Sequence, residues 1–410
     1  MGLRRVGAVV AVVAAALLAG VTNVSAAPED RELVPMEGPQ SALRTAADTQ
    51  TPISTFIPMA PVRVLDTRNA GGAVGPNGTR TLDLQGHTPA DAVAVVLNLT
   101  GTQPTANTFI SVFPAGDARP TSSTLNLSPG QTRANAVTVA LGLDRKLSLF
   151  NLAGNTHLVA DLAGYYTQNT ETGTLFNTDP PSRALDTREE GGPVGPNGVV
   201  NVDLSYLPEH ATAVTFNLTG VDATTSTVVT AYPAGVARPL ASSLNLSANE
   251  IVPNQVTVPI GEDRQVSLHN LFGNVHLVVD VSGYYSTITG SFFFAFTPLR
   301  WFDTRDSGNR PLNPNTIIAA TGWDPEVTAV AANLTATNPS APQFLTVWPG
   351  GGTQPNASNL NLVAGQTAAN AVNVGVGLET DPEVNDYSIN FTTNAGTVDV
   401  IFDVTGFFVN

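Results

Sequence analysis

The chain has 410 residues, of which 42% are hydrophobic and only 12% are charged, and its net charge is −15 at pH 7. This acidic balance argues against a nucleic-acid partner, which demands clustered positive charge, and the absence of cysteine excludes disulfide bonds. The 36 glycines and 30 prolines, together with abundant Val and Thr, favour short strands and frequent turns over helices.

The N-terminus has the features of an export signal. Arg4 and Arg5 precede an uncharged apolar run over residues 6–21, and the small residues up to Ala26 match a signal-peptidase site. The run is shorter than the ~20 residues that a membrane span needs. We therefore predict that residues 1–26 are a signal peptide and that the mature chain has no transmembrane span. Residues 27–53 are polar and without period, and we predict a linker there.

From residue 54 onward one pattern occurs three times. Asp66, Asp186 and Asp303 each begin an Asp-Thr-Arg motif, at separations of 120 and 117 residues. Asn-Leu-Thr, a Pro-(Ala/Gly)-Gly turn, Leu-Asn-Leu, a later Asn and a closing Asp-x-x-Gly motif follow in the same order each time. We place the units at residues 54–168, 169–287 and 288–410, and we expect three tandem modules of about 118 residues each.

Each unit is predicted to be all-β. In the first unit, residues 92–102, 108–116, 135–142, 146–152 and 157–166 are runs rich in Val, Leu, Thr and aromatic residues, with turn residues between them. Roughly eight such runs per unit are typical of a β-sandwich or jelly roll. Several runs alternate, so we expect one strand face to be buried and the other to be wet. Each unit has enough strands for its own core, and the first is expected to fold alone.

The ordered landmarks resemble a repeat that occurs in exported proteins of actinobacteria, alone in tandem or attached to other extracellular domains. The resemblance covers essentially all of residues 54–410 and implies extracellular β-rich modules, without implying an activity. The third unit departs from the pattern. It has Gln354 where the first two units have Arg119 and Arg238, and it carries additional residues before Asp403.

A charged cluster recurs in all three units. Its members are Arg63, Asp66, Arg68 and Asp161 in the first unit, Arg183, Asp186, Arg188 and Asp280 in the second, and Arg300, Asp303, Arg305 and Asp403 in the third. We favour a structural role, in which the cluster fastens the first strand to the last and Arg68 is largely buried, because a planar guanidinium can hold two carboxylates. The alternative is a ligand site in which Asp and Arg bind sugar hydroxyls.

Asparagine recurs at three strand positions in each unit, although it is disfavoured within strands. These residues are Asn98, Asn126 and Asn135, then Asn217, Asn245 and Asn254, and finally Asn333, Asn361 and Asn370. A buried amide must be hydrogen-bonded, so we expect these side chains to hold loops that cross the sheet edges. Amides beside exposed aromatic residues would instead form a carbohydrate site.

The sequence predicts no catalytic, cofactor-binding or metal-binding residues. The five histidines do not recur as a set, and no pair of them has zinc spacing. The leading hypothesis is a non-catalytic binding protein, secreted or held non-covalently at the cell surface, that recognises a glycan or the cell wall. The alternatives are a secreted polysaccharide hydrolase that uses paired carboxylates such as Asp66 and Asp161, and a purely structural spacer. The oligomeric state and the arrangement of the modules are left open.

Overall fold

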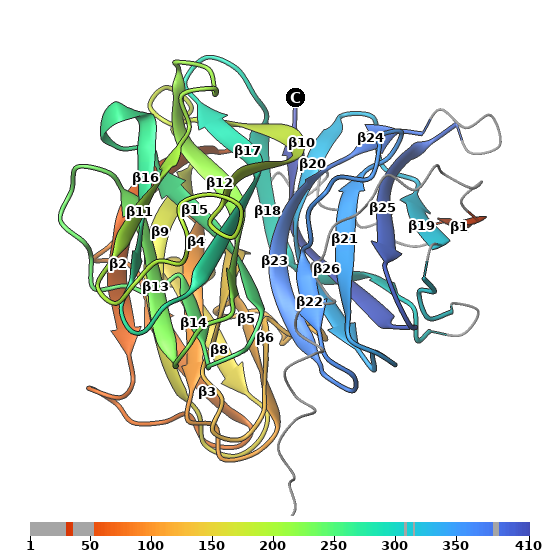
Figure 1. Cartoon of the computed structure of the whole chain (residues 1–410). Coiled ribbons are helices and arrows are strands. Elements are labelled where there is room, and N and C mark those ends of the chain that lie inside the picture. The colour runs from red at the N-terminus through yellow and green to blue at the C-terminus, as the bar shows by residue number, and fades with distance from the viewer. Residues whose placement is uncertain (1–29, 36–52, 307–309, 315, 380–384) are drawn as a thin grey trace, which may run out of the picture.

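The computed structural model describes residues 30–35, 53–306, 310–314, 316–379 and 385–410 (Figure 1). The predicted signal peptide lies outside the described residues. Strands make up almost all of the regular structure in these ranges, and the helical segments among them are two 3-10 turns, η1 (Leu143–Arg145) and η2 (Glu262–Arg264). The all-β prediction is confirmed.

Module 1 is a sandwich of two antiparallel four-stranded sheets. Its strands are β2 (Thr55–Asp66), β3 (Gly78–Asp83), β4 (Ala92–Thr102), β5 (Thr108–Pro114), β6 (Leu125–Leu127), β7 (Arg133–Ala140), β8 (Lys146–Asn151) and β9 (His157–Thr167). The first sheet has the order β2-β9-β4-β7 and the second the order β3-β8-β5-β6. Counted along the chain, the first, eighth, third and sixth strands form one sheet, and the second, seventh, fourth and fifth form the other. This is the strand order of a jelly roll.

Modules 2 and 3 repeat this topology. Module 2 contains β10 (Leu175–Asp186), β11 (Val199–Asp203), β12 (Ala211–Val221), β13 (Thr227–Pro233), β14 (Leu244–Leu246), β15 (Val252–Pro259), β16 (Gln265–Asn270) and β17 (His276–Ser286). Module 3 contains β18 (Phe292–Asp303), β19 (Thr316–Thr321), β20 (Val327–Thr337), β21 (Gln343–Pro349), β22 (Leu360–Leu362), β23 (Ala368–Gly375), β24 (Gly377–Leu378), β25 (Tyr387–Thr393) and β26 (Asp399–Val409). The expectation of three jelly-roll-like modules is therefore confirmed.

The second sheet of module 3 has an additional strand from the N-terminal segment. β1 (Asp30–Pro35) pairs in parallel with β19, from Asp30 opposite Thr316 to Pro35 opposite Thr321. The linker prediction for residues 27–53 is therefore wrong for residues 30–35. An open strand edge offers unpaired backbone N–H and C=O groups to an extended segment. Such pairing is made by the backbone and needs no periodic side-chain pattern, which is why the sequence did not reveal it.

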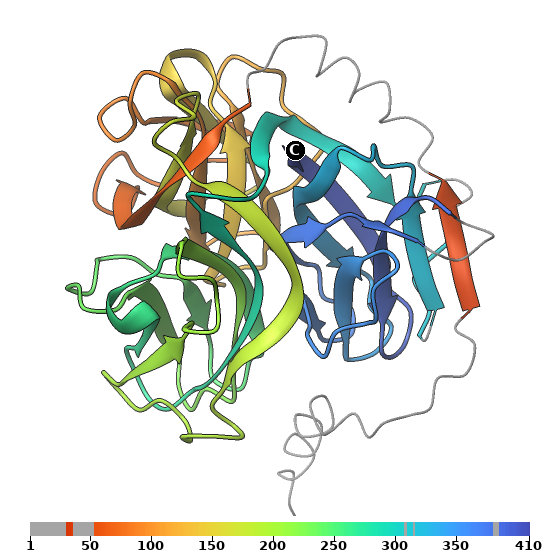
Figure 2. The same cartoon turned by 90° about the horizontal axis from the view of Figure 1, so that it is seen from above.

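The three modules surround a common centre (Figure 2). The first strand of each module contacts the sixth strand of the next, so that β2 meets β15, β10 meets β23 and β18 meets β7. The three sixth strands also contact one another, which places them at the centre. Each module has its own hydrophobic core between its two sheets, and a fourth core cluster contains residues of all three modules. The molecule is thus a closed, pseudo-threefold ring of jelly rolls; we call each contact between modules a seam.

Both faces of the third strand are buried in each module. On β4, Val95, Leu97 and Leu99 pack in the core of module 1, whereas Ala94 and Val96 pack in the shared core. The expectation of one wet face is therefore wrong for this strand and for its counterparts β12 and β20, whose burial is nearly continuous. The face expected to meet water meets the other modules instead.

Six aromatic rings close the shared core around the pseudo-threefold axis. Neighbouring ring centroids are separated by 4.2 to 5.1 Å in the order Phe56, Tyr285, Phe176, Phe408, Phe293 and Tyr166. Each module supplies one ring from its first strand and one from its last, and every second contact joins two modules. Backbone bridges close the same circle, since Phe56 pairs with Thr174, Phe176 with Ser291 and Phe293 with Ser54.

Candidate functional site

The charged clusters lie at the seams. Arg300 on β18 donates from Nε to Asp403 on β26 (2.6 Å) and from Nη1 to Asp303 (2.8 Å). Arg183 makes the same contacts with Asp280 (2.5 Å) and Asp186 (2.7 Å). In module 1, Arg63 binds Asp161 and Asp66. The second arginine of each cluster binds the Asp-Thr-Arg aspartate, in the pairs Arg68 with Asp66, Arg188 with Asp186 and Arg305 with Asp303.

In modules 1 and 3 the two arginines of a cluster differ in burial, and the side chains of Arg63 and Arg300 are 19% and 24% exposed. The Asp-Thr-Arg arginines Arg68 and Arg305 are 47% and 45% exposed, whereas Arg188 is 21% exposed. The expectation that Arg68 is largely buried is therefore wrong. The arginine three residues before the aspartate is the more enclosed one in modules 1 and 3, because it reaches from the first strand to the buried aspartate on the last strand. It is this arginine that joins the first strand to the last.

Burial and ion pairing act in opposite directions on the two aspartates of a cluster. Arg68 donates two side-chain hydrogen bonds to Asp66 and lowers the pKa of that carboxyl. Burial raises the pKa of Asp161, although Arg63 opposes this effect by hydrogen bonding and charge. The same burial raises the pKa of Asp280 and Asp403 against Arg183 and Arg300. At the last-strand aspartates the arginines thus offset part of the effect of burial on the pKa.

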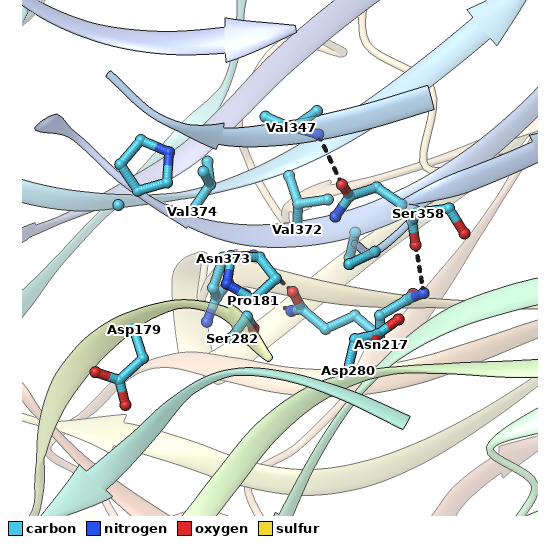
Figure 3. A pocket seen from close by; sticks show the side chains of 16 residues that line it. Asp179, Pro181, Asn217, Asp280, Ser282, Val347, Ser358, Val372, Asn373 and Val374 are labelled. Carbon is cyan, nitrogen blue, oxygen red and sulfur yellow. Dashed lines mark hydrogen bonds between the residues drawn. The ribbon is translucent and has the colours of Figure 1, made fainter. Parts of the chain in front are cut away.

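The recurrent asparagines connect the modules. Asn98 donates to the Ser242 carbonyl (2.5 Å), and its counterparts Asn217 and Asn333 donate to Ser358 (2.8 Å) and Ser123 (2.6 Å). Each of these bonds crosses a seam. We expected the amides to hold loops at sheet edges; the loops they hold belong to the next module, and Figure 3 shows this contact between Asn217 and Ser358.

A second set of asparagines forms a ring on the sixth strands. The backbone N–H groups of Ala136, Gln255 and Ala371 donate to Asn254, Asn370 and Asn135 at 2.8 to 3.0 Å, each across a seam. The amide groups of Asn135, Asn254 and Asn370 in turn donate to Asn333, Asn98 and Asn217, each at 2.8 Å. Every one of the three modules is therefore bonded to both others through a buried amide.

The third set of asparagines differs between modules. Asn126 on β6 accepts from Ser123 (3.2 Å), and Asn361 on β22 donates to Ser358 (3.1 Å). In contrast, the side-chain oxygen of Asn245 on β14 is buried and accepts no hydrogen bond in the described part of the chain. Asn245 is one of the residues that line a pocket.

The pocket occupies the seam between modules 1 and 2 and has a volume of about 310 Å³; we call it the seam pocket. One wall is the outer face of the first sheet of module 1, and the other is the second sheet of module 2 with its β13–β14 loop. Its lining residues include the basic side chains Arg63, Arg68, Arg238 and His269, the threonines Thr100, Thr102, Thr132 and Thr230, and Leu240 and Asn245. Leu240 is 80% exposed and forms an apolar rim.

At the corresponding place in the other two seams, an arginine bonds to the neighbouring module. Arg183 donates to the carbonyl of Asn356 (3.1 Å), and Arg300 donates to the carbonyl of Thr121 (3.2 Å). Among the described residues, Arg63 makes no such bond to Leu240, the counterpart of Asn356 and Thr121. At the seam between modules 3 and 1, Arg119 lies 4.1 Å from the centroid of the Phe150 ring. Arg238 instead contacts the buried His269, with Nη1 2.7 Å from Nε2.

Sequence analysis identified Arg63, Arg68 and Asn245 among the pocket residues but missed Arg238 and His269 as site residues. The sequence contained one indication of Arg238: the third unit has Gln354 at this position. An arginine is therefore not needed there to join the modules. His269 has Phe150 as its counterpart, and no periodic pattern marks it. Within the described ranges, no group of three or more His, Asp or Glu side chains is arranged to hold a metal ion, and no helix is long and apolar enough to cross a membrane.

Comparison with known proteins gives only distant likenesses. No family model matches the chain, and no curated protein matches it. A solved structure of Sulfolobus turreted icosahedral virus is 11% identical, covers 87% of this chain and 92% of its own, and has a TM-score of 0.18. A structure described as the triple jelly roll fold and turret assembly in an archaeal virus is 10% identical, with coverages of 87% and 90% and a TM-score of 0.19. The fold is therefore assigned from the strand order described above and not from these likenesses. It is a single-chain ring of three jelly rolls.

Proposed function

We propose that this chain is an exported, non-catalytic binding protein that recognises a glycan or the cell wall at the exterior of the cell. The seam pocket carries the proposal. It combines amide, hydroxyl and guanidinium groups with an apolar rim at Leu240, and carbohydrate sites use this mixture of a few placed polar groups and apolar surface. The signal-like N-terminus and the resemblance of the repeat to exported actinobacterial modules support the location.

The geometry of the paired carboxylates does not favour the hydrolase alternative. Asp161 is 1% exposed, and Arg63 binds both of its oxygens. Asp66 binds Arg63 and Arg68. A general acid and a nucleophile must both reach the glycosidic bond, and neither carboxylate has a free face toward the seam pocket.

Binding of the mature chain, residues 27–410, to a glycan array and to isolated cell wall tests the proposal. Leu240→Asn places at the pocket rim the residue that module 3 has there and should weaken binding several-fold, because apolar contact is lost. Leu143→Asn is the matched control, since Leu143 is 75% exposed and outside the pocket lining. Failure of the unaltered protein to bind any glycan or wall preparation would contradict the proposed function.

Export has its own test. Mass spectrometry of the protein recovered from culture medium should give an N-terminus at Ala27. Full-length protein beginning at Met1 and retained in the membrane fraction would show that the apolar run is an anchor.

A further inference from the structure

We propose that the seam pocket binds an acidic sugar, whose carboxylate is held by Arg238 and whose hydroxyl group donates to Asn245. This inference rests on the proposed function and narrows its ligand from glycans in general to glycans that contain sugar acids. Two properties of the pocket, one of charge and one of hydrogen bonding, lead to it independently.

The charge of the pocket is not balanced at Arg238. Arg63 and Arg68 also line the pocket, but each is paired with an aspartate. In the part of the chain that the structure describes, no carboxylate lies within ion-pairing distance of Arg238. Its neighbour His269 supplies no negative charge, and burial, together with the Arg238 charge, lowers the pKa of that ring. A guanidinium in this situation is the preferred partner of a planar carboxylate, which it binds with two parallel hydrogen bonds.

The pocket also contains a hydrogen-bond acceptor that lacks a donor, so its ligand should carry a donor as well as a negative charge. The oxygen of Asn245 is buried without a donor, and a buried acceptor left unsatisfied costs about 1–3 kcal/mol. The pocket threonines have other partners: Thr230 donates to the Ala241 carbonyl (2.8 Å), Thr102 is bonded to Thr132 (2.7 Å) and Thr100 to Ser242 (3.3 Å). A carboxylate or sulfate ion carries no donor. A sugar acid carries both the anionic group for Arg238 and the hydroxyl for Asn245.

Contacts between modules do not explain the presence of Arg238 and His269. At the seam between modules 2 and 3, Gln354 replaces Arg238 and Thr392 replaces His269, yet Arg183 and Asn217 still bridge to the neighbouring loop. The protein as a whole has a net charge of −15, so general electrostatic attraction does not favour an anion. Binding of an acidic ligand would therefore report the local chemistry of the pocket.

Isothermal titration of the mature chain with a galacturonic acid tetramer, the corresponding neutral galactose tetramer and inorganic sulfate tests the inference. We expect the acidic tetramer to bind at least about tenfold more tightly than the other two. Arg238→Gln, which copies the module 3 residue, should remove most of this preference. Asn245→Leu should weaken binding of the acidic tetramer and leave sulfate unaffected. Arg119→Gln is the matched control at another seam and should change nothing, and melting temperatures should show that each variant is folded.

Each outcome separates the two proposals. Equal binding of acidic and neutral tetramers, unaffected by Arg238→Gln, would overturn the inference and leave glycan recognition standing. Sulfate binding as tight as that of the acidic tetramer would overturn it as well, because sulfate carries no hydroxyl group. Binding of the acidic tetramer that depends on Arg238, with no binding to any polysaccharide or cell wall, would support the pocket chemistry and contradict the proposed function. No binding of any of the three ligands would overturn the inference.

Discussion

In each module two arginines share one aspartate, but they are placed differently. Arg300 lies between two carboxylates, one of which, Asp403, is 1% exposed. Arg305 is 45% exposed and binds the shared aspartate, Asp303. The chemical groups are identical, so the difference in environment should decide what each contributes to stability.

Arg300→Ala should lower the free energy of unfolding by ~3–5 kcal/mol, because it leaves a buried carboxylate without its partner. Arg305→Ala should cost less than about 1 kcal/mol, as exposed ion pairs contribute little. Urea unfolding of the two variants and the parent measures both values. Equal losses would show that burial does not distinguish these arginines.

The lowered pKa of Asp66 predicts a dependence of stability on pH. Its pKa is higher in the unfolded chain than in the folded one, so the folded state is favoured while the carboxylate is charged. This contribution is present above about pH 4 and is lost as the pH falls through the folded pKa. Melting temperatures between pH 6 and pH 2.5 should therefore fall more steeply for the parent than for Arg68→Gln. Parallel curves would contradict the assignment. The buried Asp161 is present in both proteins, and Arg68→Gln affects it through the Coulombic interaction between Arg68 and Asp161.

At the scale of single elements, the sixth strands hold the ring of modules together through their asparagines. Asn254 donates to Asn98 and to the Ser243 carbonyl, and it accepts from the N–H of Ala136. Replacing it with an apolar residue leaves these three buried groups unsatisfied. Their burial, rather than the number of bonds, makes the position sensitive.

Asn254→Leu should destabilise the protein by at least about 3 kcal/mol, since each unsatisfied buried group costs ~1–3 kcal/mol. Asn126→Leu is the control, because within the described ranges the Asn126 side chain takes part in one hydrogen bond, at 3.2 Å with Ser123; we expect a loss of about 1 kcal/mol there. Differential scanning calorimetry would give both values. A loss at Asn254 as small as that at Asn126 would exclude the asparagine ring as a main joint between modules.

The elements themselves were predictable, because strands, turns and repeats are local patterns. The sequence also predicted that the strand asparagines are hydrogen-bonded, but not to what. The partner of Asn98 is the Ser242 carbonyl, 144 residues away in another module. Arg238 and His269 come together across a loop and a strand, and their pocket exists because another module faces them. Contacts of this kind depend on how the modules are arranged, and no periodicity encodes that arrangement.

At the scale of the whole molecule, each module takes part in two seams and contributes a different surface to each. Module 1 supplies Asn98 to the loop of module 2, and it presents the Ser123 carbonyl to Asn333 of module 3. It likewise supplies both a first-strand ring, Phe56, and a last-strand ring, Tyr166, to the aromatic circle. A module by itself would expose these apolar and polar surfaces to water. We therefore no longer expect the first unit to be a stable monomer when it is expressed alone.

Residues 53–168 expressed alone should therefore associate as a closed trimer, in which Phe56 of one copy meets Tyr166 of the next. A heterologous interface that closes after three steps gives a ring rather than a fibre. Sedimentation velocity would measure the assembly state, and Phe56→Ala should shift it toward smaller species. A stable monomer with a cooperative thermal transition would show instead that the shared core is dispensable.

The aromatic circle has one further consequence. The hydroxyl groups of Tyr166 and Tyr285 bond to each other at 2.7 Å, and the third position is Phe408, which has none. Three identical subunits would bring three hydroxyls to this centre or none, and an odd number cannot be divided into pairs. Covalent fusion removes that restriction, because each copy can then mutate by itself. A fused chain can therefore have different residues at its three equivalent central positions and at its three seams, whereas a homotrimer cannot.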